Sequence, residues 1–522
     1  MWQSQLTIPG KVDANGAGVV GVPFLWLGHN ATTAWSGTAA DTTRTYTLFA
    51  LEPVPGDPTS YLVDDNSEQM VRRDVSVQKS DDTTVTHPQW WSRYGPVVPR
   101  LGTQDLPWTA ETAYSPADAN AENIRMISST ARLMRARDTD EAVRGLRETQ
   151  GLPWMNIFMA DSRGRAEYPQ LHTVPNVTDT KATGCNTELG KQTWGARGLA
   201  VLDGSKSECG WGRDGDAVRP GTFGPANLPN LQRDDYLENS NDSYRLTNPQ
   251  QPITGFSRIL GPTATERTAR TRGGLTEVTK QLSTAKFTRQ SAQELMFSNR
   301  NYIADLAVED TVRFCRTLSA DLQQACHVLS TWDRKNNVDS RGALLFDRYR
   351  AAVRATAGTA VWQVPFNPAD PINTPNTLDT GIPAVGAALA TAVADLRTAD
   401  IPLDAPLGDN QYVVRNGERI PIGGGTARLG VYNSIGGNWD PAKGYTEMRH
   451  GAIYLHVVSF DGDRCPDTGP LPAYSQSADS TSPHYSDQTK LHSQKKWVTE
   501  RFCERDVLRS PELRVVQVRQ HR

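Results

Sequence analysis

Residues 17–27 read AGVVGVPFLWL, a mostly apolar run interrupted by glycine and proline, and this composition predicts a β-strand near the start of the chain. Further along, residues 43–51 (TRTYTLFAL) alternate roughly with a period of two, which predicts a second strand. Residues 71–86 alternate Val, Ser and Thr, a pattern typical of a half-exposed antiparallel strand. The first third of the chain is therefore predicted to be rich in β-structure.

The texture changes after residue 119, because apolar residues between 119 and 150 recur at spacings of three and four, which predicts one or two amphipathic helices. Strand character returns at residues 451–460 (GAIYLHVVSF) and from residue 497 to the terminus. Strands first, helices between and strands last predict a single α+β body over residues 1–522, with a loop-rich insertion at about residues 175–250. Helical periodicity between these strands covers residues 276–282, 291–296, 304–332, 341–357 and 385–396.

The bulk composition excludes several classes of protein. The chain has 522 residues, of which 37% are hydrophobic and 22% charged, and its net charge of −3 provides no basic surface for nucleic acid. The longest apolar run, residues 384–396, is too short to span a membrane and contains Asp395. We therefore expect neither a nucleic-acid partner nor a transmembrane helix.

The cysteines suggest an oxidising compartment. None of them forms a C-x-x-C pair or lies near histidines at metal-binding spacing, and disulfides between sequential neighbours would close the short loops Cys185–Cys209 and Cys315–Cys326. Six buried thiols in a cytosolic protein are the alternative. The N-terminus, MWQSQLTIPGK, lacks the features of a signal peptide, so we expect a segment to be missing upstream. The six cysteines are Cys185, Cys209, Cys315, Cys326, Cys465 and Cys503.

Common catalytic motifs are absent from the sequence. It contains no H-E-x-x-H, no G-x-S-x-G and no G-x-x-x-x-G-K-[ST]. Residues 184–192 (GCNTELGKQ) resemble a phosphate loop, but the spacing is one too long and no Ser or Thr follows Lys191. His29 could act as a base, although a histidine just after an apolar strand is more often structural. These patterns alone predict only a globular protein.

Nine short segments stand in order along nearly the whole chain: Leu6–Thr7–Ile8–Pro9–Gly10; Gly28–His29–Asn30 with Ala34–Trp35; Tyr94–Gly95–Pro96; Gly151–Leu152–Pro153–Trp154 with Asn156; Asn239–Ser240–Asn241–Asp242–Ser243 with Leu246–Thr247–Asn248–Pro249; Asn337–Val338–Asp339–Ser340; Leu407–Gly408–Asp409; Gly430–Val431–Tyr432–Asn433; and Ser482–Pro483–His484–Tyr485 with Asp487–Gln488. Together these segments resemble the penicillin acylase family, in its branch of aculeacin A acylases and acyl-homoserine-lactone acylases.

The resemblance implies the four-layer αββα sandwich of the N-terminal-nucleophile hydrolases, with helical and loop insertions and its first strand or strands missing. It also implies a self-cleaved precursor whose freed N-terminal serine is the nucleophile, with its own α-amine as the base. In relatives that serine lies roughly thirty residues before the segment matching Leu6–Gly10, so we expect the printed chain to lack it and to be inactive by itself. No cofactor is implied.

Catalytic residues are carried over by the same resemblance. The side-chain amide of Asn241 and the backbone N–H of Ala39 match the two donors of the family's oxyanion hole. Arg270 best matches an arginine that orients the site, and Arg267 is the alternative. Without the resemblance, Asn241 would be interpreted as a polar turn residue and Arg270 as a solvated charge.

An acyl pocket is implied by further matching positions, although Val22 and Leu27 could equally be strand core. Thr130 stands where relatives have Trp, and Phe24 where a smaller aliphatic residue is usual, so the sequence predicts no acyl length. Some relatives hold calcium, but Asp41 lacks a convincing set of partner ligands, so no metal is predicted. The matching pocket positions are Val22, Phe24, Trp26, Leu27 and Trp154.

The first functional hypothesis is an acylase that cleaves the amide of a lipopeptide, an acyl-homoserine lactone or a penicillin-type substrate, with roles in antibiotic metabolism or quorum quenching. The resemblance implies a small α-subunit from the same precursor as partner, and a periplasmic or secreted location. The alternative is an inactive truncated fragment, or a non-catalytic binder of acyl amphiphiles. Upstream coding sequence leading to a Ser-Asn start would favour the acylase.

Overall fold

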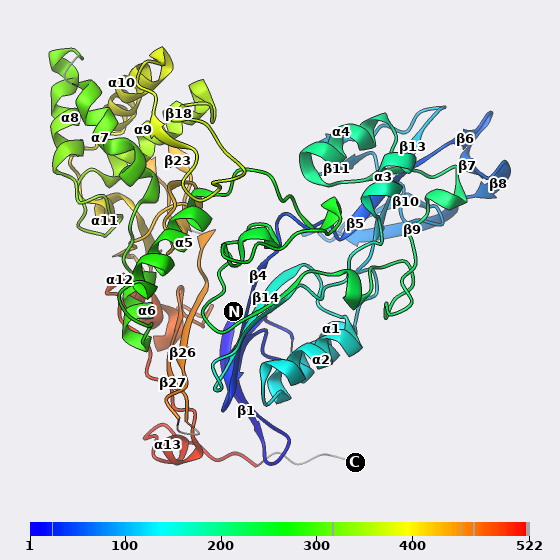
Figure 1. Cartoon of the computed structure of the whole chain (residues 1–522), viewed down its shortest axis with the longest axis horizontal. Coiled ribbons are helices and arrows are strands. Elements are labelled where there is room, and N and C mark those ends of the chain that lie inside the picture. Colours follow the sequence, from blue (N-terminus) through cyan, green and yellow to red (C-terminus); the bar gives the residue numbers. More distant parts are fainter. Residues whose placement is uncertain (23, 316–317, 449, 463–464, 518–522) are drawn as a thin grey trace. The chain divides into compact units, whose positions relative to one another are not determined.

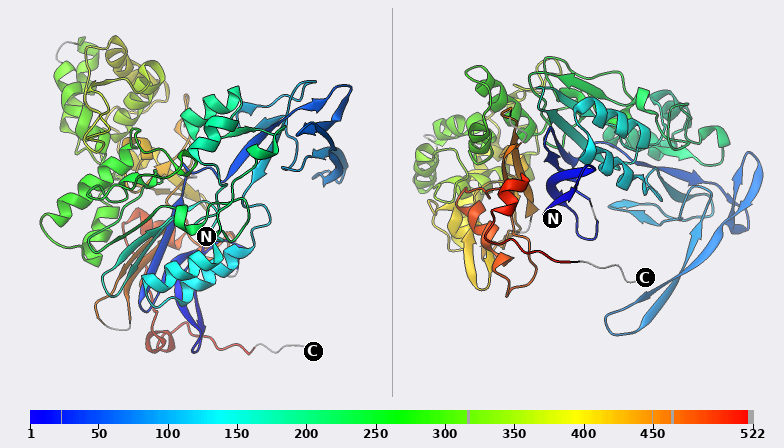
Figure 2. Two further views of the ribbon diagram at one scale, coloured as in Figure 1. Left: turned by 45° about the vertical axis from the view of Figure 1, so that its right-hand side comes forward. Right: turned by 90° about the horizontal axis from the view of Figure 1, so that it is seen from below.

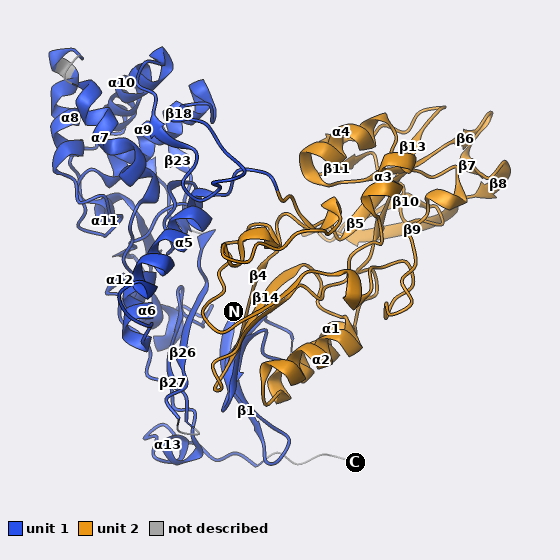
Figure 3. Cartoon of the chain, in the orientation of Figure 1, with its two compact units in different colours: residues 1–34, 264–522 blue, residues 35–263 orange. Residues whose placement is uncertain are grey.

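The computed structural model describes residues 1–22, 24–315, 318–448, 450–462 and 465–517 of the chain. These residues form two compact units (Figure 3). Unit 1 combines Met1–Ala34 with Ala264–Arg522, and unit 2 is the continuous segment Trp35–Thr263. Unit 1 is therefore built from both ends of the chain.

Unit 2 contains two main sheets. In one, β4, β14, β15 and β17 are successive neighbours, and β14 pairs antiparallel with β15. In the other, β5 lies between β13, which is antiparallel to it, and β16, which is parallel to it. The strands are β4 (Thr33–Ala39), β5 (Tyr46–Leu51), β6 (Pro53–Val54), β7 (Asp57–Val63), β8 (Asn66–Gln69), β9 (Val71–Gln78), β10 (Thr84–Trp91), β11 (Arg100–Leu101), β12 (Gln104–Asp105), β13 (Ala113–Asp118), β14 (Met155–Asp161), β15 (Ala166–Pro169), β16 (Val201–Asp203) and β17 (Asn230–Arg233).

The sequence predicts one or two helices between residues 119 and 150, and the structure has two, α1 (Arg125–Arg135) and α2 (Thr139–Thr149), of which α2 packs on β14 and β15 (Figure 1). The side chain of Asp138 accepts a hydrogen bond from the Glu141 backbone N–H, which caps the start of α2. The loop-rich segment at 175–250 contains two short helices, α3 (Asp179–Cys185) and α4 (Glu188–Arg197).

Unit 1 holds the larger helical core. Helices α7 to α10 bury apolar faces against one another, as Ala307, Leu345 and Leu389 show, each at most 1% exposed. Helix is present in all five stretches predicted after residue 270, but the stretch at 304–332 forms two helices, α7 and α8, and its residues 316–317 lie outside the described part of the chain. The helices are α5 (Ala269–Leu282), α6 (Arg289–Met296), α7 (Tyr302–Cys315), α8 (Ala320–Thr331), α9 (Ala343–Ala357), α10 (Pro383–Thr398), α11 (Leu407–Asn410), α12 (Asp487–Ser493) and α13 (Glu504–Leu508).

The strands of unit 1 come from both ends of the chain. At the N-terminal end, β1 pairs with β2 and β2 with β3, all antiparallel, and near the C-terminal end β26 pairs with β27. The strands are β1 (Trp2–Ile8), β2 (Val12–Gly18), β3 (Leu27–Asn30), β18 (Trp362–Val364), β19 (Asn376–Leu378), β20 (Tyr412–Arg415), β21 (Glu418–Pro421), β22 (Ile435–Gly436), β23 (Trp439–Asp440), β24 (Gly444–Tyr445), β25 (His450–Gly451), β26 (Tyr454–Ser459) and β27 (Asp467–Pro472).

Three strand predictions require correction, first those at residues 17–27 and from residue 497. The run at 17–27 is not one strand: β2 ends at Gly18, Gly21 adopts a positive φ of 83°, and the chain turns back so that Ala17 pairs with Leu27. From residue 497 to 517 the only regular element is the short helix α13, so the expected β-structure there is wrong for the described residues.

The predicted strand at 71–86 is a hairpin. Strands β9 and β10 reverse near Asp82, which has a positive φ of 62°, and every residue of β9 is exposed. Figure 2 shows this hairpin in its right-hand view as a long two-stranded ribbon. Helices and mainly antiparallel sheets together give the mixed α and β architecture that the sequence predicts, whereas the four-layer sandwich stays a prediction.

Candidate active site

Asn241 and Ala39 lie together in unit 2, although 202 residues separate them in the sequence. The Nδ2 group of Asn241 donates a hydrogen bond to the carbonyl oxygen of Ala39 at 3.0 Å, and it also contacts the Thr38 hydroxyl. Ala39 is the last residue of β4. The structure thus brings together the two residues to which the resemblance gives oxyanion-hole roles.

The backbone of Asn241 is in the left-handed region, with φ at 68°. Asparagine is one of the few residues other than glycine that adopts this conformation readily. Asn239 fixes the turn around it, because its Oδ1 accepts from the Asp242 backbone N–H at 3.1 Å and its Nδ2 donates to the Asp242 carbonyl at 2.9 Å. The two asparagines of this segment therefore have different parts: Asn239 shapes the loop and Asn241 points its amide at β4.

A buried polar chain supports this loop from β14 and β15. The Tyr168 hydroxyl donates to Asn156 Oδ1 at 2.7 Å, and Asn156 Nδ2 donates to Asn239 Oδ1 at 3.3 Å. Tyr168 is fully buried, and burial raises its pKa well above the usual value, so the phenol stays a donor. Sequence reasoning assigned no role to Asn156, Asn239 or Tyr168; an asparagine inside the apolar strand MNIFMAD was the available signal.

Trp154 also lies beside the end of β4. Its backbone carbonyl accepts a hydrogen bond from the Ala40 N–H at 2.9 Å, while 51% of its surface remains exposed. Thr130, which stands where relatives have Trp, is buried on α1 and donates to the Met126 carbonyl at 2.9 Å. Trp154 is thus the predicted pocket residue that shares unit 2 with Asn241 and Ala39.

The remaining predicted site residues belong to unit 1. Phe24 is buried, with 6% of its surface exposed, whereas Val22, before β3, and Leu27, the first residue of β3, are half-buried. Arg270 is half-buried in the first turn of α5. Arg267, the alternative to Arg270, is buried and lines a cavity of about 420 Å³ together with Arg272. Arg272 donates to the backbone carbonyls of residues 372 and 375, so it is a structural residue of unit 1.

Comparisons with known proteins point to one family. The sequence model of the family described as penicillin amidase matches residues 1–509. The chain is 39% identical over 538 aligned positions to the aculeacin-A acylase of Actinoplanes utahensis, covering 99% of this chain and 66% of that protein. It is 34% identical over 527 positions to the acyl-homoserine lactone acylase PvdQ of Pseudomonas syringae pv. syringae, covering 98% of this chain and 66% of that protein.

The fold is also similar to that of a solved structure. A thermostable penicillin G acylase from Alcaligenes faecalis superimposes with a TM-score of 0.63 at 15% identity, over 100% of this chain and 94% of that one. At that identity the likeness concerns the fold alone. The chain spans slightly less than two thirds of the length of the curated relatives it matches. Among the residues that the structure describes, no helix is long and apolar enough to cross a membrane.

Proposed function

The chain belongs to the penicillin amidase family, and from that premise we propose that it forms the oxyanion-binding part of an acylase that hydrolyses the amide of an acylated amine. The observation that supports this proposal is the contact between the Asn241 amide and Ala39. Both residue types occupy positions at which the family places its oxyanion donors.

In the proposed reaction, an N-terminal serine attacks the amide carbonyl, while its own α-amine accepts the hydroxyl proton. The tetrahedral oxyanion accepts hydrogen bonds from Asn241 Nδ2 and the Ala39 backbone N–H. The proton passes to the leaving amine, and water then releases the acid from the acyl-serine. We propose that a segment outside residues 1–522 supplies this serine.

In the free protein the Asn241 amide already has an acceptor, which the oxyanion must displace. Asn241 Nδ2 already donates to the Ala39 carbonyl at 3.0 Å, so an oxyanion has to replace that carbonyl as the acceptor. The exchange preserves the number of hydrogen bonds and gives Nδ2 a charged partner, and charge-assisted hydrogen bonds are roughly twice as strong as neutral ones. The amide would therefore act more strongly in the transition state than in the free protein.

Substrates named for the relatives define the assay. We propose acyl amides with an amine-bearing core, of which acyl-homoserine lactones and aculeacin A, the substrates in the relatives' names, are the two to test first. Release of the free amine is measured on protein from its native source. Turnover that disappears when the N-terminal serine is blocked supports the proposal. Binding of the amides without amine release would instead support a non-catalytic binder.

Mass spectrometry separates these outcomes from a processing failure. The intact mass and the N-terminal sequence of every chain in the purified protein are determined. A mature chain that begins with serine roughly thirty residues before Leu6, accompanied by a small α-subunit, is the expected result. A mature chain that begins at Met1 would overturn the proposed mechanism for this product.

We also propose that the protein is exported to the periplasm or beyond. The support is that all six cysteines are paired, as Cys185–Cys209, Cys315–Cys326 and Cys465–Cys503. Disulfides persist in oxidising compartments and are rare in reducing ones. Fractionation of the native cells, with the pairing checked by mass spectrometry, tests this location.

A further inference from the structure

A cluster of metal-ligating side chains lies in unit 1, separate from the residues of unit 2 described above. His29 is in β3, His456 is in β26, and Glu500 is in the segment that follows α12. One potential ligand atom from each of the three residues lies within 4.8 Å of the other two. The side chains of His29, His456 and Glu500 are 0%, 10% and 2% exposed, so the cluster is shielded from water.

The protonation of His29 leaves a place for a cation. Its Nδ1 lies 3.1 Å from the backbone carbonyl of Asn30, which can only accept, so Nδ1 carries a proton. In the neutral ring the other nitrogen, Nε2, then presents a lone pair, yet it faces Glu500 Oε1 at 2.7 Å. Two acceptors at that distance require either a proton between them, carried by His29 or by Glu500, or a metal ion beside them.

The contact between His456 and Glu500 is explained better by a metal ion than by a proton. His456 Nε2 and Glu500 Oε2 are 3.7 Å apart, which is too long for a hydrogen bond, and neither buried atom has a hydrogen-bond partner. A proton on His29 leaves both of these atoms unsatisfied. Two ligand atoms that share a zinc ion at about 2.0–2.2 Å each are separated by about 3.3–3.7 Å, which matches this pair.

We propose that His29, His456 and Glu500 bind a divalent transition-metal ion, with Zn²⁺ as the expected occupant. Two imidazoles and one carboxylate form a recognised zinc ligand set with a fourth position left for water. The hydrogen bond from His29 Nδ1–H to a backbone carbonyl is the outer contact that usually orients a metal-binding histidine. Binding moves His29 and Glu500 apart by about half an ångström, because tetrahedral zinc ligands lie about 3.3 Å from one another.

The surroundings pack the ligands firmly and link them to neighbouring segments of unit 1. The Phe502 ring packs on His29 with centroids 4.8 Å apart, and the Tyr454 ring lies 5.3 Å from His456. The disulfide Cys465–Cys503 ties the segment that carries Glu500 to the chain shortly after β26. The ion would therefore join the N-terminal strands of unit 1 to its C-terminal segment, whose sequence positions differ by 471 residues.

Cobalt binding tests the proposal without an activity assay. The full chain is prepared without a histidine tag, stripped with a chelator and titrated with Co²⁺, a spectroscopic substitute for zinc. We expect one equivalent to bind with the intense visible absorption of a four-coordinate ion, and one equivalent of Zn²⁺ to abolish that absorption. His456→Gln and Glu500→Gln should each weaken binding at least about tenfold.

His484→Gln is the matched control, because His484 pairs with Asp487 at 2.8 Å in an exposed histidine–carboxylate contact outside the cluster. Its cobalt titration should equal that of the wild type. Zinc X-ray absorption on the wild-type chain gives a second measurement that does not depend on the folding of a variant. No stoichiometric binding, a shell without two imidazoles, or equal affinity in the folded His456→Gln variant would overturn the proposal and leave a proton between His29 and Glu500.

Discussion

Asn241 combines two requirements at one position. Its amide contacts Thr38 and Ala39, and its backbone adopts a positive φ of 68° that most side chains disfavour. Only asparagine provides both a donor of this length and reasonable tolerance of this conformation. The two requirements can therefore be tested with two substitutions that remove the same amide but differ in how much the positive φ destabilises the fold.

Asn241→Gly and Asn241→Ala should both lower kcat on an accepted acyl amide about 10²–10³-fold, because each removes the same oxyanion donor. Asn241→Ala should in addition lower the free energy of unfolding by about 1 kcal/mol relative to Asn241→Gly, because alanine is strained at this φ. Turnover and denaturant unfolding measure the two effects separately. Unchanged kcat in the glycine variant would remove Asn241 from the mechanism.

His172 gives a residue-scale prediction about pH. It is fully buried, and burial lowers its pKa from 6.5 to about 4. Between pH 6.5 and pH 4 only the unfolded state takes up a proton at this residue. The free energy of unfolding therefore decreases as the pH is lowered, by up to about 3 kcal/mol, and levels off below pH 4. Unfolding measured in steps across this range should show a smaller loss in His172→Gln than in the wild type.

His327→Gln is the control for this pH dependence, since His327 is exposed. Its stability should follow the wild-type curve across the same range. His492 is buried with a pKa also lowered to about 4, so it should account for part of the slope that remains in His172→Gln. A His172→Gln curve parallel to the wild-type curve would contradict the prediction.

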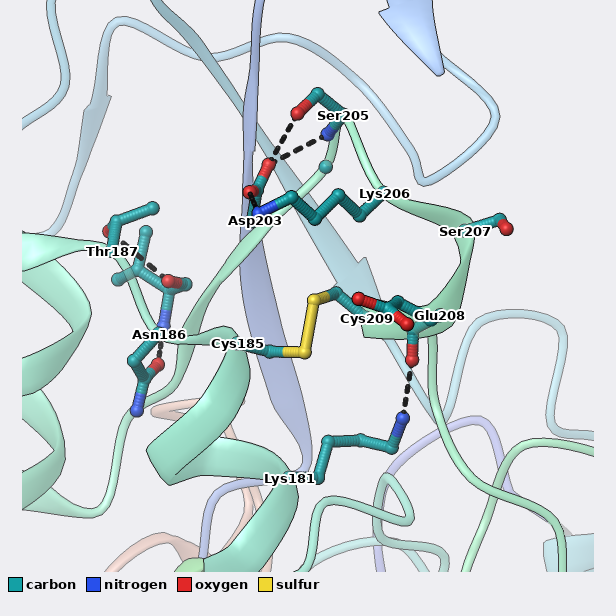
Figure 4. Close-up of a disulfide and its surroundings, with 12 residues drawn as sticks. Lys181, Cys185, Asn186, Thr187, Asp203, Ser205, Lys206, Ser207, Glu208 and Cys209 are labelled. Atoms are coloured by element: carbon teal, nitrogen blue, oxygen red, sulfur yellow. Dashed lines mark hydrogen bonds and ion pairs between the residues drawn. A yellow bond between two sulfur atoms is a disulfide. The ribbon is translucent and has the colours of Figure 1, made fainter. Parts of the chain in front are cut away.

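At the scale of elements, the short helix α3 is stabilised by contacts at its C-terminal end. α3 is short, and its last residue, Cys185, is joined to Cys209 of a 3₁₀ turn (Figure 4). Lys181 of the same helix donates to the Glu208 carbonyl at 2.7 Å, beside the disulfide. The crosslink therefore fixes a helix that has little capacity to be stable alone.

Replacing both Cys185 and Cys209 by alanine should lower the free energy of unfolding by about 3 kcal/mol, because the bond closes a loop of 24 residues. Hydrogen exchange should show the loss of protection in α3 and the neighbouring β16. The matched control is the double alanine variant at Cys315 and Cys326, whose loop spans 11 residues of unit 1. Equal exchange changes in unit 2 for both variants would contradict a local effect.

At the scale of the whole molecule, unit 1 is assembled from the two ends of the chain. The Gln3 backbone N–H donates to Gln476 Oε1 at 2.7 Å, and Gln5 Nε2 donates to the Phe502 carbonyl at 2.8 Å. These contacts, with the pair His29–Glu500, join the N-terminal strands to the C-terminal segment. The stability of β26 and α12 should therefore depend on residues that lie more than 400 positions upstream.

Removing residues 1–34 should raise the hydrogen-exchange rates of β26 and α12 at least about tenfold, because the segment that carries Phe502 loses its partners. Deleting the β9–β10 hairpin, residues 71–91 of unit 2, is the control and should leave the exchange of β26 unchanged. Mass-spectrometric exchange on the two shortened chains provides the comparison. Equal effects of the two deletions would show that the contacts with the N-terminal strands are not what stabilises β26.

The sequence by itself determined the features that depend on near neighbours. Periodicity of three and four located α1, α2 and α5 to α10, and the spacing of neighbouring cysteines suggested Cys185–Cys209 and Cys315–Cys326, with free thiols as the alternative. Ordered motifs identified the family and singled out Asn241 and Ala39. The helices and the two short cysteine loops can be predicted without knowledge of the chain path, because their interacting groups lie within a few turns or a short loop.

Only the tertiary structure decided what distant segments do together. The sequence did not reveal the reversal between β2 and β3, because an apolar run is compatible with one long strand and with a hairpin of two strands. The support of Asn239 by Asn156 and Tyr168 had only one sequence signal, an asparagine in an apolar strand, and the cluster of His29, His456 and Glu500 had none. Such contacts depend on how sheets and chain ends are brought together in space, and residues far apart in the sequence then share one buried, low-dielectric environment.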